Sequence, residues 1–288
     1  MRVLVTGATG TVGAAVVAEL AKYDCERIPA VRDPRRVAMP NAHSFDFTEP
    51  DSYTSLLSGI DSLFLVRPPA IGDVDRYIAP VIRTAARQGV GRIVFLSIQG
   101  VESMPWVPHA KIEARIREEG IPSVFLRAGF FMQNLVGAHL AEIRDERRIV
   151  LPAGRSRTAF VDTRDIAAVA AHELTADPAG SPETGERALT LTGTESLTYR
   201  EVSVVLSEAT GETIRYKSPN LLSFILRRRR RGDSWKQAAV MAMLYTITRF
   251  GNAAGVTNDI SRVLGRPPRK LAEFAADYRD YWIPTRPE

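Results

Sequence analysis

The sequence is poor in cysteine and histidine: its 288 residues include one cysteine, Cys25, and four histidines. A single cysteine excludes an internal disulfide and a metal site built from several thiolates, and it is typical of a reducing, cytoplasmic setting. The histidines at positions 43, 109, 139 and 172 lack the H-E-x-x-H or similar spacing of metal ligands, so we expect no metal cofactor. The chain also contains no G-x-S-x-G motif, which argues against a nucleophile elbow.

Long hydrophobic runs are missing as well. The apolar stretches at residues 125–136 and 238–247 are too short or too interrupted to span a bilayer. Residues 1–5 already have the pattern of a strand, so we expect no cleavable signal peptide. The prediction is a cytoplasmic protein that does not associate with membranes.

The net charge of +5 has one dense centre, the five consecutive arginines at residues 227–231. Such a run can attract phosphate backbones or an anionic membrane surface. No interleaved aromatic side chains offer bases a stacking platform, which argues against nucleic acid. A solvated loop or helix end in the C-terminal part is therefore favoured.

Residues 1–175 alternate short Val/Ile/Leu-rich runs with amphipathic stretches, the pattern of a parallel sheet covered on both faces by helices. Strands are expected at residues 2–6, 27–31, 42–45, 62–66, 92–96 and 123–127. Helices are expected at residues 12–23, 75–88 and 108–119. The sequence therefore predicts the α/β class, with a Rossmann-type doubly wound parallel sheet.

After Gly154 the pattern changes to short strands, at 158–161 and 187–191, and a growing share of helix. The helices are expected at residues 163–174, 196–208, 234–249, 259–264 and 270–281, and a Pro/Gly loop at 177–185. We expect a Rossmann-type domain over 1–154, to which segments such as 155–195 return. Residues 196–288 would form a smaller, mainly helical region that covers the substrate.

The sharpest motif is VTGATGTVG at residues 5–13, which lies between a predicted strand and a predicted helix. Gly7 permits a tight turn, Gly10 lets the backbone approach a pyrophosphate, and Gly13 lets the helix pack close to the strand. The anion would lie at the helix N-terminus, where unpaired N–H groups and the helix dipole favour it. The predicted dinucleotide contacts are Gly7, Thr9, Gly10, Thr11, Val12 and Gly13.

The end of the second predicted strand indicates which dinucleotide binds. NAD-preferring domains usually carry an acidic residue about 20 residues past the glycine loop, for the ribose 2′-hydroxyl. Here the segment VRDPRR places Arg32 at that position, with Arg35 and Arg36 close by. An arginine suits a 2′-phosphate by charge and by its planar fork of donors, so we predict NADPH, bound by Arg32 and Arg36. Two alternatives stay open: Asp33 partners the ribose, or the arginines are only a surface cluster.

Val66 and Arg67 end the fourth predicted strand, at the edge of the sheet where the cofactor is expected. Arginine is unusual at a position that is often apolar or small. Its side chain has three possible destinations: a cofactor phosphate, an acidic substrate or solvent. We count both residues among the expected cofactor contacts.

Seven segments together resemble the NmrA-like group of atypical short-chain dehydrogenases. They are TGATGTVG, VRDP, FDFTEP, FLSIQGVE, HAKIE, GIPSVFLRAGFFMQN and FVDTRDIA, and the late LTGTESLTYREV and LGRPPRKLAEFAADY extend the likeness to nearly the whole chain. The glycine loop is shared broadly, whereas HAKIE followed by GIPSVFLRAGFFMQN is more particular to this group. The resemblance implies an NADPH-dependent quinone, azo-dye or triphenylmethane reductase, or a redox-sensing regulator with little turnover.

The resemblance also implies contacts along the cofactor. Asp46 would bind the adenine amino group with Phe47 nearby, and Ser97 would contact the nicotinamide ribose. The residues after the sixth strand would lie beside the nicotinamide, with Phe131 and Asn134 at a planar substrate; they are Gly129, Phe130, Phe131 and Asn134. Judged without the resemblance, Asp46 is typical of a cap or turn, Ser97 of a strand-end hydrogen bond, and the phenylalanines of core packing.

The chain departs from the usual catalytic set of this superfamily. Typical short-chain dehydrogenases use a Tyr whose pKa is lowered by a Lys four residues later. None of the eight tyrosines here has Lys at that spacing. This disfavours alcohol–ketone chemistry and a sugar epimerase or dehydratase.

HAKIE starts a predicted helix in which His109 and Glu113 are i, i+4 neighbours. We expect both to be partly buried toward the sheet, with Glu113 fixing the imidazole tautomer and raising the pKa of His109. By resemblance, His109 would contact the nicotinamide end and supply charge or a proton, so both are candidate catalytic residues. A His–Glu pair that only holds the helix end, with the proton coming from solvent, is the alternative.

These features favour an NADPH-dependent reductase that transfers hydride to a planar, electron-poor acceptor such as a quinone, azo compound or enone. Catalysis would depend mainly on proximity and orientation. The alternative is an NADPH-binding sensor without turnover, for which residues 227–231 would be a partner surface. The oligomeric state stays open.

Overall fold

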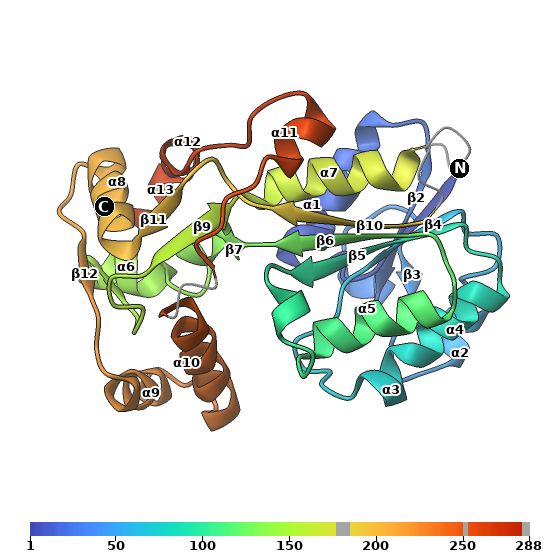
Figure 1. Ribbon diagram of the computed structural model, residues 1–288, viewed down its shortest axis with the longest axis horizontal. Coiled ribbons are helices and arrows are strands. Elements are labelled where there is room, and N and C mark those ends of the chain that lie inside the picture. The colour runs from blue at the N-terminus through green and yellow to red at the C-terminus, as the bar shows by residue number, and fades with distance from the viewer. Residues whose placement is uncertain (177–184, 250–252, 284–288) are drawn as a thin grey trace. The chain divides into compact units, whose positions relative to one another are not determined.

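The computed structural model describes residues 1–176, 185–249 and 253–283, and it consists of two compact units (Figure 1). Unit 1 comprises Met1–Ala128, Thr163–Leu191 and Asp259–Arg266, and unit 2 comprises Gly129–Asp162, Thr192–Asn258 and Pro267–Glu288. The first boundary follows Ala128 rather than residue 154, because apolar side chains of the 129–162 segment are buried in the core of unit 2. Residues 177–184 of the expected loop lie outside the described residues.

Unit 1 is built on a seven-stranded sheet in which every pair of neighbours is parallel. The strand order is β10-β6-β5-β4-β1-β2-β3. The strands are β1 (Arg2–Val5), β2 (Glu26–Val31), β3 (His43–Ser44), β4 (Ser62–Leu65), β5 (Arg92–Ile98), β6 (Ser123–Ala128) and β10 (Glu186–Leu191). The central strands are buried on both faces, which explains their continuous apolar runs. The predicted Rossmann-type sheet is confirmed.

Helices cover both faces of this sheet (Figure 1). One face carries α1 (Thr11–Glu19), α7 (Thr163–Thr175) and α11 (Asp259–Leu264), and the short helix η1 (Leu20–Lys22) extends α1. The other carries α2 (Asp51–Thr54), α3 (Val74–Tyr77), α4 (Ala79–Arg87) and α5 (Pro108–Glu118), with η3 (Val101–Ser103) before α5. The helix expected at 75–88 is divided at Ile78, because Pro80 lacks the N–H that would continue the ladder and its ring clashes with the preceding turn.

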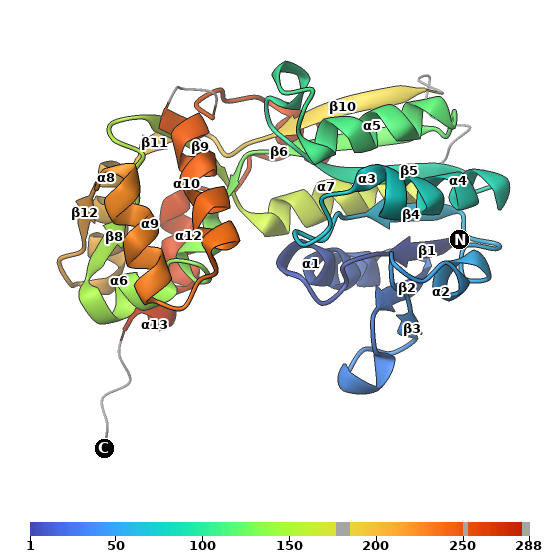
Figure 2. The ribbon, with the colours of Figure 1, turned by 90° about the horizontal axis from the view of Figure 1, so that it is seen from below.

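Unit 2 combines two small sheets with helices. The strand β9 (Arg157–Val161) pairs in parallel with β7 (Phe130–Phe131) and antiparallel with β11 (Ser196–Thr198), while β8 (Arg148–Val150) pairs with β12 (Arg215–Lys217). The helices are η4 (Met132–Leu135), α6 (Leu140–Glu146), α8 (Tyr199–Thr210), α9 (Leu221–Arg230), α10 (Trp235–Arg249), α12 (Leu271–Asp277) and α13 (Arg279–Trp282). Figure 2 shows α9 beside α10.

Two details of unit 2 follow from local chemistry. The helix expected from residue 196 begins at Tyr199, because Thr198 and Glu201 form a reciprocal capping box and residues 196–198 pair with β9. Trp282 is fully buried, and its indole N–H donates to the carbonyl of Leu135 at 3.0 Å.

Within the described residues, no helix combines the length and apolar character needed to cross a bilayer.

Candidate functional site

The glycine loop between β1 and α1 closes on itself. Gly7 has φ +63°, in the left-handed region, and its carbonyl accepts the N–H of Gly10 at 2.8 Å. A Cβ at Gly13 would lie 2.2 Å from the Gly7 oxygen, so only glycine allows α1 to start this close to the turn. No side chain caps the N-terminus of α1 at Gly10, so no capping side chain competes with an anion for its first N–H groups.

Thr6 holds the loop against the end of β4. Its buried hydroxyl donates to the carbonyl of Phe64 at 3.0 Å and accepts the N–H of Val66 at 2.8 Å. Val66 is thereby placed next to Gly7, where a Cβ on the glycine would lie 3.4 Å from it. The role of Thr6 was not predicted from the sequence; its one signal there is a hydroxyl directly after the apolar residues Val3–Val5.

The three arginines after β2 differ in their partners. Asp33 caps the short helix η2 (Pro34–Arg36): its carboxylate accepts the N–H of Arg35 at 3.1 Å and the Arg35 Nε–H at 3.0 Å. Arg36 pairs with the same carboxylate at 3.3 Å, and the bonds from Arg35 lower the pKa of Asp33. The side chain of Arg32 is exposed, and its guanidinium has no polar partner within the described residues; its backbone carbonyl accepts the hydroxyl of Ser44 at 3.4 Å. Of the three guanidinium groups, that of Arg32 is therefore the one not already paired with Asp33.

Asp46 and Phe47 have local structural tasks. Asp46 Oδ1 accepts the backbone N–H of Thr48 at 2.8 Å and its hydroxyl at 2.7 Å, which makes a tight turn after β3. Phe47 is buried and packs edge-to-face on Phe45, with 4.9 Å between ring centroids. Contact of either residue with adenine stays a prediction.

Glu113 contacts Ser97 and two arginines rather than His109. The Ser97 hydroxyl donates to Glu113 Oε1 at 2.7 Å, and Arg127 Nη2 and Arg117 Nη2 donate to Oε2 at 2.8 and 3.1 Å. The expected pairing of Glu113 with His109 is wrong, because this carboxylate, only 2% exposed, is satisfied by the fixed charge of Arg127 on β6. The hydroxyl proton of Ser97 is committed to Glu113, so toward any other group its oxygen can act only as an acceptor.

His109 is a half-buried residue in the first turn of α5, and its ring centroid lies 6.1 Å from that of Phe95. It has no hydrogen-bond partner within the described residues. Burial, together with the positive charge of Arg67, lowers the pKa of His109 to about 4. The expected rise in this pKa is therefore wrong in sign, and at neutral pH the imidazole is uncharged.

The protonation of His109 can be measured by NMR titration of the histidine ring protons, with His109→Gln to assign the signal. We expect a midpoint near 4 rather than the ordinary 6.5. Between these pH values His109 binds more protons in the unfolded chain than in the folded chain. The free energy of unfolding therefore falls as the pH falls, by at most about 3 kcal/mol. His109→Gln should lose this part of the pH dependence. A midpoint of 6 or above would contradict the prediction.

The remaining predicted contacts belong to unit 2. Phe130 and Phe131 form β7, which pairs with Phe160 and Val161 of β9. Both phenylalanines are half-buried, and the ring of Phe130 lies 6.2 Å from that of Tyr245. Gly129, Phe130, Phe131 and Asn134 are thus brought together in unit 2, while all the other predicted site residues belong to unit 1. Their contacts with the nicotinamide and substrate stay predictions.

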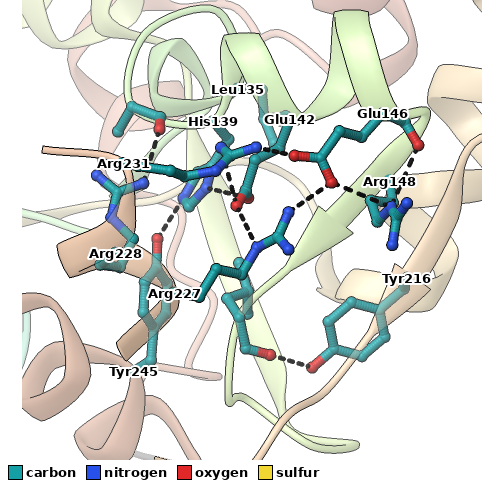
Figure 3. Close-up of polar contacts among 12 residues, drawn as sticks. Leu135, His139, Glu142, Glu146, Arg148, Tyr216, Arg227, Arg228, Arg231 and Tyr245 are labelled. Atoms are coloured by element: carbon teal, nitrogen blue, oxygen red, sulfur yellow. Dashed lines mark hydrogen bonds and ion pairs between the residues drawn. The ribbon is translucent and has the colours of Figure 1, made fainter. Parts of the chain in front are cut away.

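The arginine run ends helix α9, and two of its members, Arg227 and Arg231, pair with carboxylates of α6 (Figure 3). Arg227 Nε donates to Glu142 at 3.0 Å and Arg227 Nη2 to Glu146 at 2.5 Å. Arg231 Nη1 lies 3.0 Å from Glu142 and its Nη2 bonds Glu146. The run is thus a helix end, one of the two interpretations that the sequence favoured, but the apolar start of α9 was not expected.

The other arginines of the run are also engaged, with one exception. Arg228 pairs with Asp233, and the Arg229 guanidinium lies 4.9 Å from the centre of the Trp235 ring. Within the described residues only Arg230 has no such partner. Intramolecular pairing therefore accounts for most of the charge in this run.

A buried polar cluster of His139, Glu142 and Tyr245 was not predicted from the sequence. His139 and Glu142 are 2% and 1% exposed, and His139 Nε2 is hydrogen-bonded to the hydroxyl of Tyr245 (Figure 3). His139 Nδ1 lies 3.9 Å from Glu142, and burial raises the pKa of Tyr245, which stays a neutral phenol. The cluster links α6 to α10. Elsewhere in the described chain, as here, no three His, Cys, Asp or Glu side chains are grouped to hold a metal ion.

Comparison with known proteins gives a consistent result. The model of the NmrA-like family matches residues 1–281. NAD(P)H azoreductase from Xenophilus azovorans is 31% identical over 284 residues, which cover 95% of this chain and 96% of that protein. Triphenylmethane reductase from Citrobacter sp. has the same fold, with TM-score 0.86 and 22% identity over 97% of this chain and 100% of that one. The NADPH complex of an NADPH-dependent quinone oxidoreductase from Escherichia coli gives TM-score 0.85 and 23% identity, over 96% and 99%.

Proposed function

The chain belongs to the NmrA-like family, and from this membership we propose that it is an NADPH-dependent oxidoreductase that reduces a planar, electron-poor acceptor. Quinones, azo compounds and enones are the acceptor classes in view. The observation that carries the proposal is the closed glycine loop at an uncapped helix N-terminus, together with the unpaired Arg32 at the end of the next strand. A relative that is 31% identical over nearly its full length is an NAD(P)H azoreductase, which supports the same chemistry.

The residues of unit 1 fit this cofactor. The N–H groups at the start of α1 would hold the pyrophosphate, and Arg32 the 2′-phosphate, with Arg36 in a lesser role because Asp33 already pairs with it. Ser97 would accept a ribose or carboxamide donor, since its own proton is held by Glu113. When bound, NADPH supplies a hydride from its nicotinamide. The proposal keeps the predicted contacts with the cofactor or the substrate for the remaining residues: Asp46, Phe47, Val66, Gly129, Phe130, Phe131 and Asn134.

Proton supply separates this site from that of a typical short-chain dehydrogenase. The sequence has no Tyr with Lys four residues later, and His109 is uncharged at neutral pH. His109 therefore orients a ligand through a neutral ring, and the proton that completes reduction comes from solvent. Acceptors whose reduced form takes its proton from water, such as quinones, suit this arrangement. The same features favour a second candidate, an NADPH sensor without turnover.

The test is NADPH oxidation followed by absorbance against a panel of quinones, azo dyes and enones, with NADH in parallel. We expect turnover with NADPH and at least about 10-fold higher kcat/KM than with NADH. Equilibrium binding of NADPH is measured separately. Binding without turnover on any acceptor would favour the sensor, and no binding of either nucleotide would overturn both candidates.

A further inference from the structure

Arg67 follows β4 and is anchored by its own loop. One nitrogen of the guanidinium, Nη1, donates to the carbonyls of Pro68, Pro69 and Ile71 at 3.1, 3.4 and 2.7 Å. These bonds fix the plane of the guanidinium without neutralising its charge. Within the described residues Arg67 forms no ion pair.

The opposite edge of the guanidinium has no protein partner. Arg67 Nε is buried and makes no hydrogen bond, and none is made by Nη2 within the described part of the chain. Nε and Nη2 lie side by side on one edge of the plane, which is the two-donor fork that binds a carboxylate, sulfonate or phosphate. A buried donor without an acceptor is rare in folded proteins, so this edge points to a ligand.

In the described part of the chain, no negative charge close to this fork compensates the positive charge of the Arg67 guanidinium. The nearby His109 is neutral, since burial and Arg67 together lower its pKa to about 4. Glu113, at the same end of the sheet, is committed to Arg117, Arg127 and Ser97. An anionic group on a ligand would therefore meet a complementary charge and a preformed pair of donors.

We propose that the Nε–Nη2 edge of Arg67 binds a carboxylate or sulfonate on the acceptor, so that the preferred substrates are anionic. This inference rests on the proposed function, because it assumes an acceptor. In the proposed function, the glycine loop after β1 and Arg32 after β2 would already bind the cofactor phosphates. Arg67 follows β4 on the other side of β1, toward β5 and α5, whose first turn carries His109.

The test compares 1,4-naphthoquinone with its 2-sulfonate in wild type, Arg67→Gln and Arg67→Lys. In Arg67→Gln we expect the KM of the sulfonate to rise at least about 10-fold more than the KM of the neutral quinone. Arg67→Lys should recover part of the loss, because lysine keeps the charge but lacks the fork. High salt should raise the KM of the sulfonate alone.

The matched control is Arg87→Gln. Arg87 is exposed in the last turn of α4 and has no polar partner within the described residues, so the variant removes one charge from the same unit. We expect both quinones to be reduced as in wild type. An equal loss for both quinones in Arg67→Gln would overturn the inference, because Arg67 would then only hold its loop. Weaker NADPH binding in Arg67→Gln would assign the fork to the cofactor and also overturn it.

A binding measurement separates this inference from the proposed function. Anthraquinone-2-sulfonate is titrated into the NADP⁺-loaded protein, and tryptophan fluorescence reports binding without turnover. If no acceptor is reduced, the proposed function fails on its own. Loss of sulfonate binding in Arg67→Gln would support the fork, and unchanged binding would overturn it.

Discussion

Gly13→Ala should weaken NADPH binding on the order of 100-fold. The added Cβ would lie 2.2 Å from the oxygen and 2.6 Å from the carbonyl carbon of Gly7. Both are backbone atoms, and the turn at Gly7 is held in a left-handed conformation, so the loop must open or α1 must move. Either change displaces the N–H groups that would hold the pyrophosphate. Fluorescence titration with NADPH measures the loss.

Two other glycine substitutions test whether the loss of NADPH affinity follows the crowding around the added Cβ. A Cβ at Gly10 would lie 3.3 Å from the Gly7 oxygen, and one at Gly72 would meet nothing within 4 Å. We expect Gly72→Ala to bind NADPH as wild type does and Gly10→Ala to be intermediate. Denaturant unfolding should show Gly13→Ala destabilised by about 1–3 kcal/mol, the usual effect of overpacking. Wild-type affinity in Gly13→Ala would refute the assignment of the loop.

Arg32→Gln should abolish the preference for NADPH over NADH. The Arg32 guanidinium has no partner within the described residues, so it would give a 2′-phosphate charge-assisted hydrogen bonds that NADH cannot use. We expect the Kd of NADPH to rise on the order of 10- to 100-fold, with that of NADH unchanged. Equilibrium titration with both nucleotides gives the ratio.

Arg35→Gln is the matched control for Arg32. It removes the same charge from the same loop, but Arg35 is bound to the Asp33 carboxylate, so it contributes little to a phosphate. We expect NADPH affinity within about 3-fold of wild type. An equal loss of NADPH and NADH in Arg32→Gln would instead indicate that Arg32 supports the loop itself.

Local features of this protein were predictable from the sequence. The glycine loop and the parallel strands depend on residues within a few positions of one another, whereas the arginine run was left open between a loop and a helix end. The spacing of Gly7, Gly10 and Gly13 between a strand and a helix indicates the turn from neighbouring residues alone. Errors in the predicted helix bounds arose where a single residue interrupts a periodic pattern. Pro80, for example, divided the helix expected at 75–88.

The partners of charged side chains were not predictable in this way. Glu113 and His109 have the spacing of a helical pair, yet Glu113 is satisfied by Ser97 and Arg127, 16 and 14 positions away. Tyr245 meets His139 across 106 positions, and no sequence pattern connects them. Arg67 had three possible destinations, and the structure ties one nitrogen to its loop while leaving the other edge unpaired.

The sequence by itself thus determined the sheet, the glycine loop and the family, because backbone conformation and apolar periodicity act between near neighbours. The tertiary structure alone decided which carboxylate pairs with which arginine, that His109 is neutral, and that Arg67 has an open edge. The physical reason is that desolvation and charge pairing depend on which distant segments the fold brings together. Which countercharge a buried ionisable group meets, as for Glu113, or whether it meets none, as for Arg67, is set by the fold rather than by position in the chain.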